Sequence, residues 1–151
     1  MKKTIQRLKN ERGLTLVELL AVIVILAIIA VIAFVFIGGI IENSKKDAHI
    51  ANAQQIISAA KLHEATGGEK DFTGTGMSVE KLISEKYLDE VLDPWTKDTY
   101  ADLDKAMVTK EKEENENKYK FKLSNFNASG DCNITADELE INKGDRGDLC
   151  K

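Results

Sequence analysis

The chain is dominated by one long apolar run, from Leu14 to Ile41, which contains a single charged residue, Glu18. The uncharged part of this run, from Leu19 to Ile41, is 23 residues long. A helix of that length spans ~35 Å, more than the ~30 Å hydrocarbon core of a bilayer. The sequence therefore predicts a membrane-spanning helix close to the N-terminus.

A short basic leader precedes the apolar run and ends at Gly13. The leader carries five Lys and Arg residues against one acidic residue, whereas the segment just after Ile41 is balanced in charge. Loops rich in Lys and Arg stay on the cytoplasmic side of a membrane span. We therefore expect the N-terminus in the cytoplasm and the rest of the chain outside.

The charge at Glu18 needs an explanation of its own. A carboxylate in an apolar helix costs about 2.5–3.5 kcal/mol at the bilayer centre and usually marks a function. No Lys, Arg or His lies between Leu14 and Ile41, so an ion pair within the segment is excluded. The missing positive charge would have to come from another chain or from a new amino terminus.

Residues 12–20, Arg-Gly-Leu-Thr-Leu-Val-Glu-Leu-Leu, closely resemble the class III signal of type IV pilins and the related pseudopilins. In that family a membrane enzyme, prepilin peptidase, cleaves after the glycine and methylates the new N-terminal amine. The resemblance implies cleavage after Gly13 and N-methylation of Leu14, where family members most often have Phe. It also implies an assembly role for Glu18, the fifth residue after the cut, which would neutralise the amine of a neighbouring subunit.

The N-terminal region allows two other interpretations. A plain single-pass anchor, with Glu18 reaching toward one membrane surface, stays an alternative. An ordinary secretory signal peptide fits less well, because its apolar region is about 7–15 residues long and precedes a small-x-small cleavage site.

The remaining residues leave room for one small globular domain. Beyond Ile41 the chain has 16 Lys and Arg against 23 Asp and Glu, a net charge of −7. This acidic balance argues against direct nucleic acid binding, which needs a basic surface. We find no phosphate-binding loop or nucleophile constellation, and we expect no enzyme activity. His49 and His63 are expected on a helix, at its surface or partly packed, rather than as metal ligands or bases.

Apolar residues at helical spacing extend the N-terminal helix beyond the membrane. Ile50, Ala53, Ile57 and Ala60 form an amphipathic stripe within a predicted helix over 42–66. Upstream, Gly38-Gly39 offers either a weak point in the helix or a site for close helix packing. A second, shorter helix is predicted over 78–88, where Ser78 can act as N-cap. The tripeptide 93–95, Asp-Pro-Trp, is similar to a stretch of pseudopilins and of several Gram-positive pilins.

The C-terminal third predicts strands within about 105–142. Tyr119, Phe121 and Leu123 alternate with lysines, which is typical of a strand with the apolar side chains facing inward. A hairpin loop is expected over 111–117, and Leu139 and Ile141 suggest a further extended segment. The expected fold is α+β: a long N-terminal helix, with a transmembrane half and an amphipathic half, packed on a small antiparallel sheet. The expected parts are a leader (1–13), a transmembrane or filament-core helix (14–41) and an ectodomain (42–151).

The two cysteines, Cys132 and Cys150, lie in the exported region. In an oxidising compartment such a pair most simply forms a disulfide, which stabilises by about 3 kcal/mol for a loop of this size. Pilins of Gram-negative bacteria commonly close a C-terminal loop in this manner. The resemblance therefore favours a pilin over a pseudopilin, although the Asp-Pro-Trp stretch favours the reverse.

The segment around Cys132 also resembles an EF-hand calcium loop in the spacing of its oxygen atoms. Three features differ from that motif: the loop starts with Asn, Cys132 replaces the turn glycine, and no helix pattern flanks the loop. A plain polar turn is the alternative, and no other cofactor is expected. The candidate calcium ligands are Asn127, Ser129, Asp131, Asn133 and Glu138.

Together these features predict the structural subunit of a type IV pilus-like surface filament. Its expected partners are copies of itself, prepilin peptidase, the membrane, and a pilus assembly platform with its ATPase. We expect the chain in the bacterial cell membrane before assembly and in a surface filament afterwards. The alternatives are a pseudopilin of a type II secretion or DNA-uptake filament and a single-pass membrane-anchored extracellular binding protein.

Overall fold

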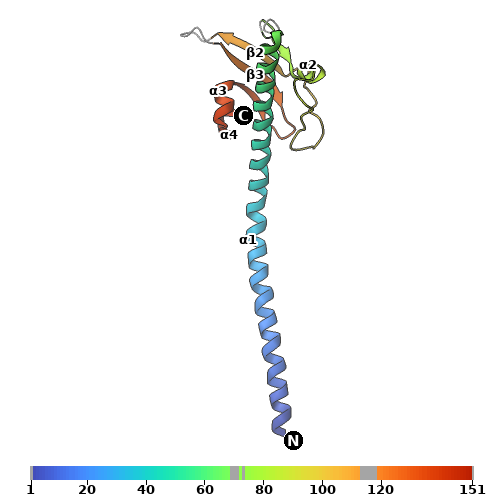
Figure 1. The fold of residues 1–151 in the computed structure, drawn as a ribbon. Coiled ribbons are helices and arrows are strands. Elements are labelled where there is room, and N and C mark those ends of the chain that lie inside the picture. The colour runs from blue at the N-terminus through green and yellow to red at the C-terminus, as the bar shows by residue number, and fades with distance from the viewer. Residues whose placement is uncertain (1, 69–71, 73, 113–118, 151) are drawn as a thin grey trace. The chain divides into compact units, whose positions relative to one another are not determined.

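The computed structural model describes residues 2–68, 72, 74–112 and 119–150, with side chains from Thr15 onward except at Gly68. The chain divides into two compact units, Met1–Ile41 and Glu42–Lys151. Helix α1 (Lys2–His63) makes up the first unit and continues into the second, as labelled in Figure 1.

The first unit consists of α1 alone. The helix runs without interruption through Gly38 and Gly39, and no proline occurs before residue 94. The glycine pair therefore does not break α1 here, and its role in assembly stays a prediction. Every residue from Thr15 to Ile41 is exposed, so no described residue of this unit covers their apolar side chains.

In the second unit α1 ends at His63 and is followed by a short π-helical turn, η1 (Glu64–Gly68). Gly67 adopts a φ of +112°, which side chains disfavour and glycine tolerates. Gly67, at the end of the amphipathic pattern, thus interrupts the helical conformation just after α1.

The sheet is antiparallel, with four strands in the order β1-β2-β3-β4. It comprises β1 (Met77–Ser78), β2 (Met107–Lys112), β3 (Tyr119–Asn127) and β4 (Asn133–Asp137). Strand β1 was not predicted from the sequence. Val108 pairs with Leu123 at the centre of the sheet, whereas residues 113–118, most of the predicted hairpin loop, lie outside the described residues.

The hydrophobic core lies between α1 and the sheet. Ile50, Ala53, Ile57 and Ala60 are buried on one side of it, as the helical stripe predicts. From the sheet come apolar side chains at alternate positions: Val108, Phe121, Leu123, Phe126, Ile134 and Ala136. This arrangement confirms the predicted α+β fold, a long N-terminal helix packed on a small antiparallel sheet.

Tyr119 differs from the prediction that the apolar residues of β3 face inward. Phe121 and Leu123 are buried, but Tyr119 is 58% exposed. It pairs with Lys112 near the end of the β2–β3 ladder, and the Lys110 ammonium lies 4.7 Å from its ring centroid. The alternation places Tyr119 on the core face, but no apolar cover buries its ring there.

The predicted helix over 78–88 is shorter in the structure. Helix α2 (Val79–Ser84) begins at the Ser78 N-cap, as expected, but residues 85–88 do not continue it. Lys86 adopts a φ of +64°, and the N–H groups of Lys86 and Tyr87 bond to the carbonyls of Ile83 and Leu82. These contacts form a Schellman turn, which closes the helix.

The extended segment predicted around Leu139 and Ile141 is instead a helix, α3 (Glu138–Lys143). Asp137 caps its first turn in a reciprocal capping box with Glu140, and Gly144 ends it in a left-handed conformation. Ile141 is buried and Leu139 is 63% exposed, because a helix places residues two apart on different sides. A single turn, α4 (Arg146–Leu149), follows.

Candidate processing and assembly site

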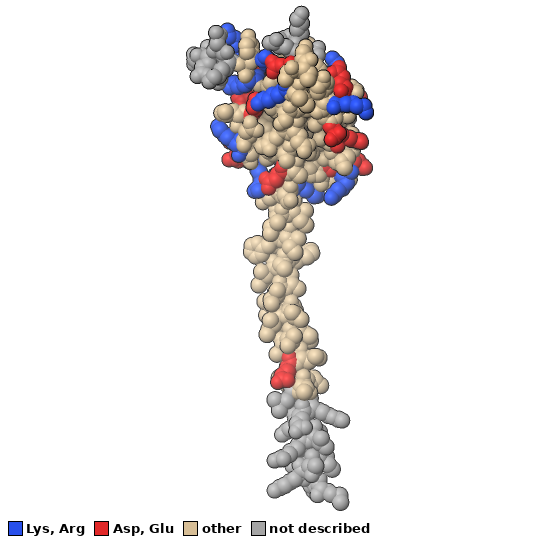
Figure 2. Space-filling model, viewed as in Figure 1, with Lys and Arg blue, Asp and Glu red and all other residues tan. Residues whose placement is uncertain are grey.

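The described part of α1 contains one stretch long and apolar enough to cross a membrane. Its most apolar 18-residue window has a mean hydropathy of 3.6, and none of that window is buried. Figure 2 shows this part of the helix as uncharged surface, interrupted by acidic atoms near its grey end. A free surface of this kind requires either lipid or other apolar helices around it.

Glu18 is the charge within this surface. It is exposed, and its neighbours Val17 and Leu19 are 66% and 67% exposed. Since no basic residue lies between Leu14 and Ile41, a counter-charge for Glu18 within this stretch is excluded by the sequence itself. In an apolar environment the carboxylate therefore needs a positive group from elsewhere.

The predicted cleavage site lies one turn before Glu18. The backbone of Gly13 and Leu14 is helical, and the side chain of Leu14 is not among the described ones. Cleavage there would make Leu14 the first residue, with its amine at the start of the apolar helix. The assignment of Gly13 and Leu14 as the processing site stays a prediction.

The buried carboxylate of Asp93 joins two segments of the ectodomain by hydrogen bonds. Asp93 is 3% exposed. Its carboxylate accepts hydrogen bonds from the backbone N–H groups of Trp95 (2.8 Å) and Ser129 (2.8 Å) and from the Ser129 hydroxyl (2.6 Å). Burial raises the pKa of this carboxyl, but the hydrogen bonds from Ser129 and Trp95 outweigh it, so its pKa lies below the usual range. Asp93 thus fastens the turn after β3 to the Asp-Pro-Trp segment.

Trp95, within the Asp-Pro-Trp segment, contacts α1 and the turn after β3. Its indole N–H donates to the Glu42 carboxylate at 3.2 Å, at the start of the second unit. Its ring packs on Gly130 so closely that an added Cβ would lie 1.9 Å from it. The position of the indole therefore requires glycine at position 130. The Asp-Pro-Trp stretch holds the turn after β3 and the start of the second unit together.

Both histidines are more buried than predicted: His49 is 0% and His63 is 4% exposed. A chain of hydrogen bonds fixes the His49 ring. Asn52 donates to the Tyr100 oxygen (2.9 Å), the Tyr100 hydroxyl lies 2.8 Å from Nδ1 of His49, and Nε2 lies 3.2 Å from the Phe126 carbonyl. Because the carbonyl only accepts, Nε2 carries the proton and Nδ1 accepts from Tyr100.

The surroundings of His49 keep it neutral. Its ring stacks on Phe126 at 4.5 Å between centroids. Burial lowers the pKa of His49 to about 4, although the Phe126 carbonyl and the Asp93 charge favour the protonated form. This histidine is a packed core residue rather than a base or a metal ligand. His63 is likewise engaged, with its Nε2 2.9 Å from a Glu85 oxygen.

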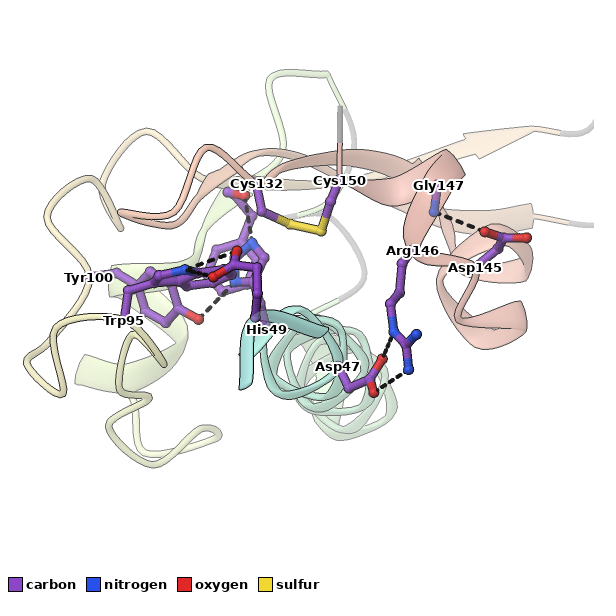
Figure 3. Close-up of a disulfide and its surroundings, with 11 residues drawn as sticks. Asp47, His49, Trp95, Tyr100, Cys132, Asp145, Arg146, Gly147 and Cys150 are labelled. Carbon is purple, nitrogen blue, oxygen red and sulfur yellow. Dashed lines mark hydrogen bonds and ion pairs between the residues drawn. A yellow bond between two sulfur atoms is a disulfide. The ribbon is translucent and has the colours of Figure 1, made fainter. Parts of the chain in front are cut away.

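Cys132 and Cys150 form a disulfide, as the sequence predicts, and this joins the turn before β4 to the C-terminal end of the described chain. Figure 3 shows this bond and, beside it, Arg146 reaching Asp47 on α1. The Arg146 Nη2 lies 2.7 Å from the Asp47 carboxylate. The segment over α3 and α4 is thus held at one end by a covalent bond and along α1 by polar contacts.

Three of the five candidate calcium ligands, Asn127, Asp131 and Asn133, line one pocket, and calcium binding there stays a prediction. Asn127 and Asn133 are paired residues of β3 and β4. The Ser129 hydroxyl donates to Asp93, and Glu138 lies beyond the far end of β4, where it pairs with Lys61 on α1. Among the described residues, no group of three or more His, Cys, Asp or Glu side chains could hold a metal.

The sequence does not predict the hydrogen bonds that link Asn52, Tyr100 and His49, nor the role of Asp93. The Asp-Pro-Trp stretch was recognisable, but its partner Ser129 is 36 residues away. Residue type and spacing carry no signal for such a long-range pair.

Comparison with known proteins bears on the N-terminal helix. Residues 8–34 match a family described as the prokaryotic N-terminal methylation motif. No curated protein and no solved structure matches the chain. The matched residues include Gly13, Leu14 and Glu18 and most of the exposed apolar helix. The chain therefore carries a class III N-terminal methylation signal, which is characteristic of type IV pilins and pseudopilins.

Proposed function

We propose that this chain is a structural subunit of a type IV pilus-like surface filament. The observation that carries the proposal is the methylation signal placed directly on an apolar helix whose described side chains are exposed from Thr15 to Ile41. The signal implies processing by a prepilin peptidase and a structural subunit rather than an enzyme. In a filament, the helices of neighbouring subunits would cover one another's apolar surface.

We propose that Glu18 sets the axial stagger between neighbouring subunits of this filament. After cleavage behind Gly13, each subunit brings one new positive charge, the Leu14 amine, and one unpartnered carboxylate. Placing the amine of one copy beside Glu18 of another satisfies both charges. Leaving either charge alone in an apolar core is expensive, so one subunit stagger is favoured over the others.

The same features support a location and a set of partners. The basic leader favours a cytoplasmic N-terminus and an external ectodomain in the membrane-held precursor. The disulfide between Cys132 and Cys150 fits that oxidising side. Assembly from the membrane requires an assembly platform and an ATPase, which supplies the energy for extracting the apolar helix.

A pseudopilin of a type II secretion or DNA-uptake filament is the second candidate, because the same signal marks both groups. The Asp-Pro-Trp segment supports that candidate through its similarity to pseudopilins. The disulfide between Cys132 and Cys150 supports a pilin instead, and on that ground the pilus-like filament is preferred.

Filament formation by a Glu18 variant tests the proposal. Glu18→Leu removes a carboxylate from an apolar helix and should still insert in the membrane, but it should yield few filaments in shear preparations viewed by electron microscopy. Val22→Leu, an apolar change one turn further along the same helix, serves as the control and should assemble normally. Normal numbers of Glu18→Leu filaments would show that the carboxylate has no role in assembly.

A further inference from the structure

The β3–β4 hairpin carries the two Asn-x-Ser/Thr tripeptides of the chain. The first begins at Asn127, the last residue of β3, and the second at Asn133, the first residue of β4. The two asparagines pair directly with each other in the sheet, and both are exposed. In exported proteins this tripeptide is the acceptor for N-linked sugars, provided that its middle residue is not proline. The middle residues here are alanine and isoleucine.

The hydroxyl residues of the two tripeptides differ in their surroundings. The Ser129 hydroxyl and backbone N–H both donate to the buried Asp93 carboxylate, at 2.6 and 2.8 Å. An enzyme that binds the first tripeptide through Ser129 would have to break these bonds. Thr135, in contrast, is exposed, and its oxygen accepts a hydrogen bond from the Asn125 N–H at 3.1 Å. Its hydroxyl proton stays available to a partner outside the domain.

The acceptor amide of the second tripeptide is also accessible. Within the part of the chain that the structure describes, the Asn133 carboxamide has no hydrogen-bond partner. Asp131, two residues earlier, is exposed as well. Bacterial acceptor sites for N-linked sugars have an acidic residue at this position, whereas Asn125 occupies it before Asn127. Sequence and exposure therefore both favour the tripeptide that begins at Asn133.

A polar pocket lies directly beside Asn133. Its volume is about 490 Å³, within the range of sites that hold small molecules. The Glu140 and Asp148 carboxylates in its wall can accept hydrogen bonds from sugar hydroxyls. A first sugar attached to the Asn133 amide therefore has both space and hydrogen-bond acceptors next to it. The residues that line the pocket are Asn133, Thr135, Ala136, Glu140, Asp148 and Leu149.

We propose that Asn133 is the attachment site of an N-linked glycan, transferred on the outer side of the membrane from a polyprenyl diphosphate-linked sugar. The amide nitrogen of Asn133 forms a bond to C1 of the first sugar, and the bond from C1 to the diphosphate oxygen breaks. The electron pair of that bond leaves with the diphosphate, and the amide gives up one proton to a base of the transferase. Nothing is oxidised or reduced. The inference rests on the external ectodomain of the proposed function, but it does not require filament assembly.

Mass spectrometry of the full chain, isolated from the cells that produce it, tests the proposal. The intact mass is measured for the unchanged chain and for Asn133→Gln, Thr135→Val and Thr135→Ser. Asn127→Gln is the matched control, because it alters the paired asparagine on the facing strand. Cleavage before Asp131 places the two tripeptides on separate peptides, so that the modified residue can be assigned directly.

The expected result is an added glycan mass on the peptide that contains Asn133. That mass should be absent in Asn133→Gln and Thr135→Val and retained in Thr135→Ser and Asn127→Gln. An exported chain with no added mass at Asn133 would overturn the proposal. A glycan on Asn127 instead, or one that persists in Asn133→Gln, would overturn it as well. Glycan-bearing chains that never enter surface filaments would instead refute the proposed function, so the two failures are distinguishable.

Discussion

Acid destabilisation through His49 is the prediction that the structure specifies most fully. The ring is fully buried and its pKa lies at about 4 in the folded domain, against 6.5 for an ordinary histidine. Below pH 6.5 the unfolded chain binds a proton at this position, whereas the folded domain does not until about pH 4. Stability therefore falls as the pH falls through this window.

The size of the effect follows from the difference of about 2.5 pH units between the two states. At 1.36 kcal/mol per unit, His49 should remove about 3 kcal/mol of unfolding free energy between pH 6.5 and 4, and about 2 kcal/mol by pH 5. The structural reason is burial: a proton on Nδ1 would charge a ring enclosed by Phe126 and Tyr100, and the Tyr100 hydroxyl would have to accept at that atom instead of donating to it.

The assay uses Trp95, the single tryptophan of the chain. Its indole packs on Gly130 and bonds to Glu42, so its fluorescence reports unfolding of the ectodomain. Urea unfolding of the detergent-solubilised full chain is measured at pH 7 and pH 5. His49→Gln should lower stability at pH 7 but reduce the loss between the two pH values by about 2 kcal/mol. His63→Gln is the matched control and should retain the His49 contribution, and an unchanged pH dependence in His49→Gln would refute a buried neutral ring.

Two further predictions concern the stability of the ectodomain. Reduction of the disulfide, or Cys150→Ser, should cost about 3 kcal/mol and make the segment after Cys132 protease-sensitive while α1 stays intact; free thiols titrating on the folded protein would contradict the bond. Asp93→Ala should cost about 2–4 kcal/mol in urea unfolding, because the N–H groups of Trp95 and Ser129 lose their acceptor. Ser129→Ala, which removes only the hydroxyl, should cost about 1 kcal/mol, and equal losses in the two variants would argue against a central role for the carboxylate.

The parts of the fold that the sequence predicted are those with a local, repeated signal. The stripe through Ile50 and Ala60 has the helical period, and the alternation at Phe121 and Leu123 has the strand period, so both elements could be expected before their partners were known. Glu18 stands out for a similar reason, because a charge in an apolar run needs no alignment to be noticed.

The errors arose where two local signals competed or where packing decided the outcome. Leu139 and Ile141 have the strand spacing, but the pair Asp137 and Glu140 forms a capping box, and helix formation prevailed. Tyr119 continues the alternation of β3, yet it remains exposed because no packed apolar cover reaches it. For His49, burial comes from Tyr100 and Phe126, which are remote in sequence and therefore not predictable from spacing.

Among the candidate site residues, too, those close together in sequence were easier to predict than those spread over several elements. Gly13, Leu14 and Glu18 lie within one short stretch and could be predicted together; the methylation motif covers all three, and their individual roles stay predictions. Of the candidate calcium ligands, Asn127, Asp131 and Asn133 line one pocket, whereas Ser129 bonds to Asp93 and Glu138 follows the far end of β4. Calcium binding stays a prediction.

The mass of the mature chain tests the central claim most directly. Sheared surface filaments are purified, and the intact mass and N-terminal sequence of their most abundant chain are determined. The account predicts a chain that begins at Leu14, carries one additional methyl group on its amine and retains the disulfide between Cys132 and Cys150. A mature chain that keeps Met1, or one that begins beyond Ile41 and has lost the apolar helix, would contradict it.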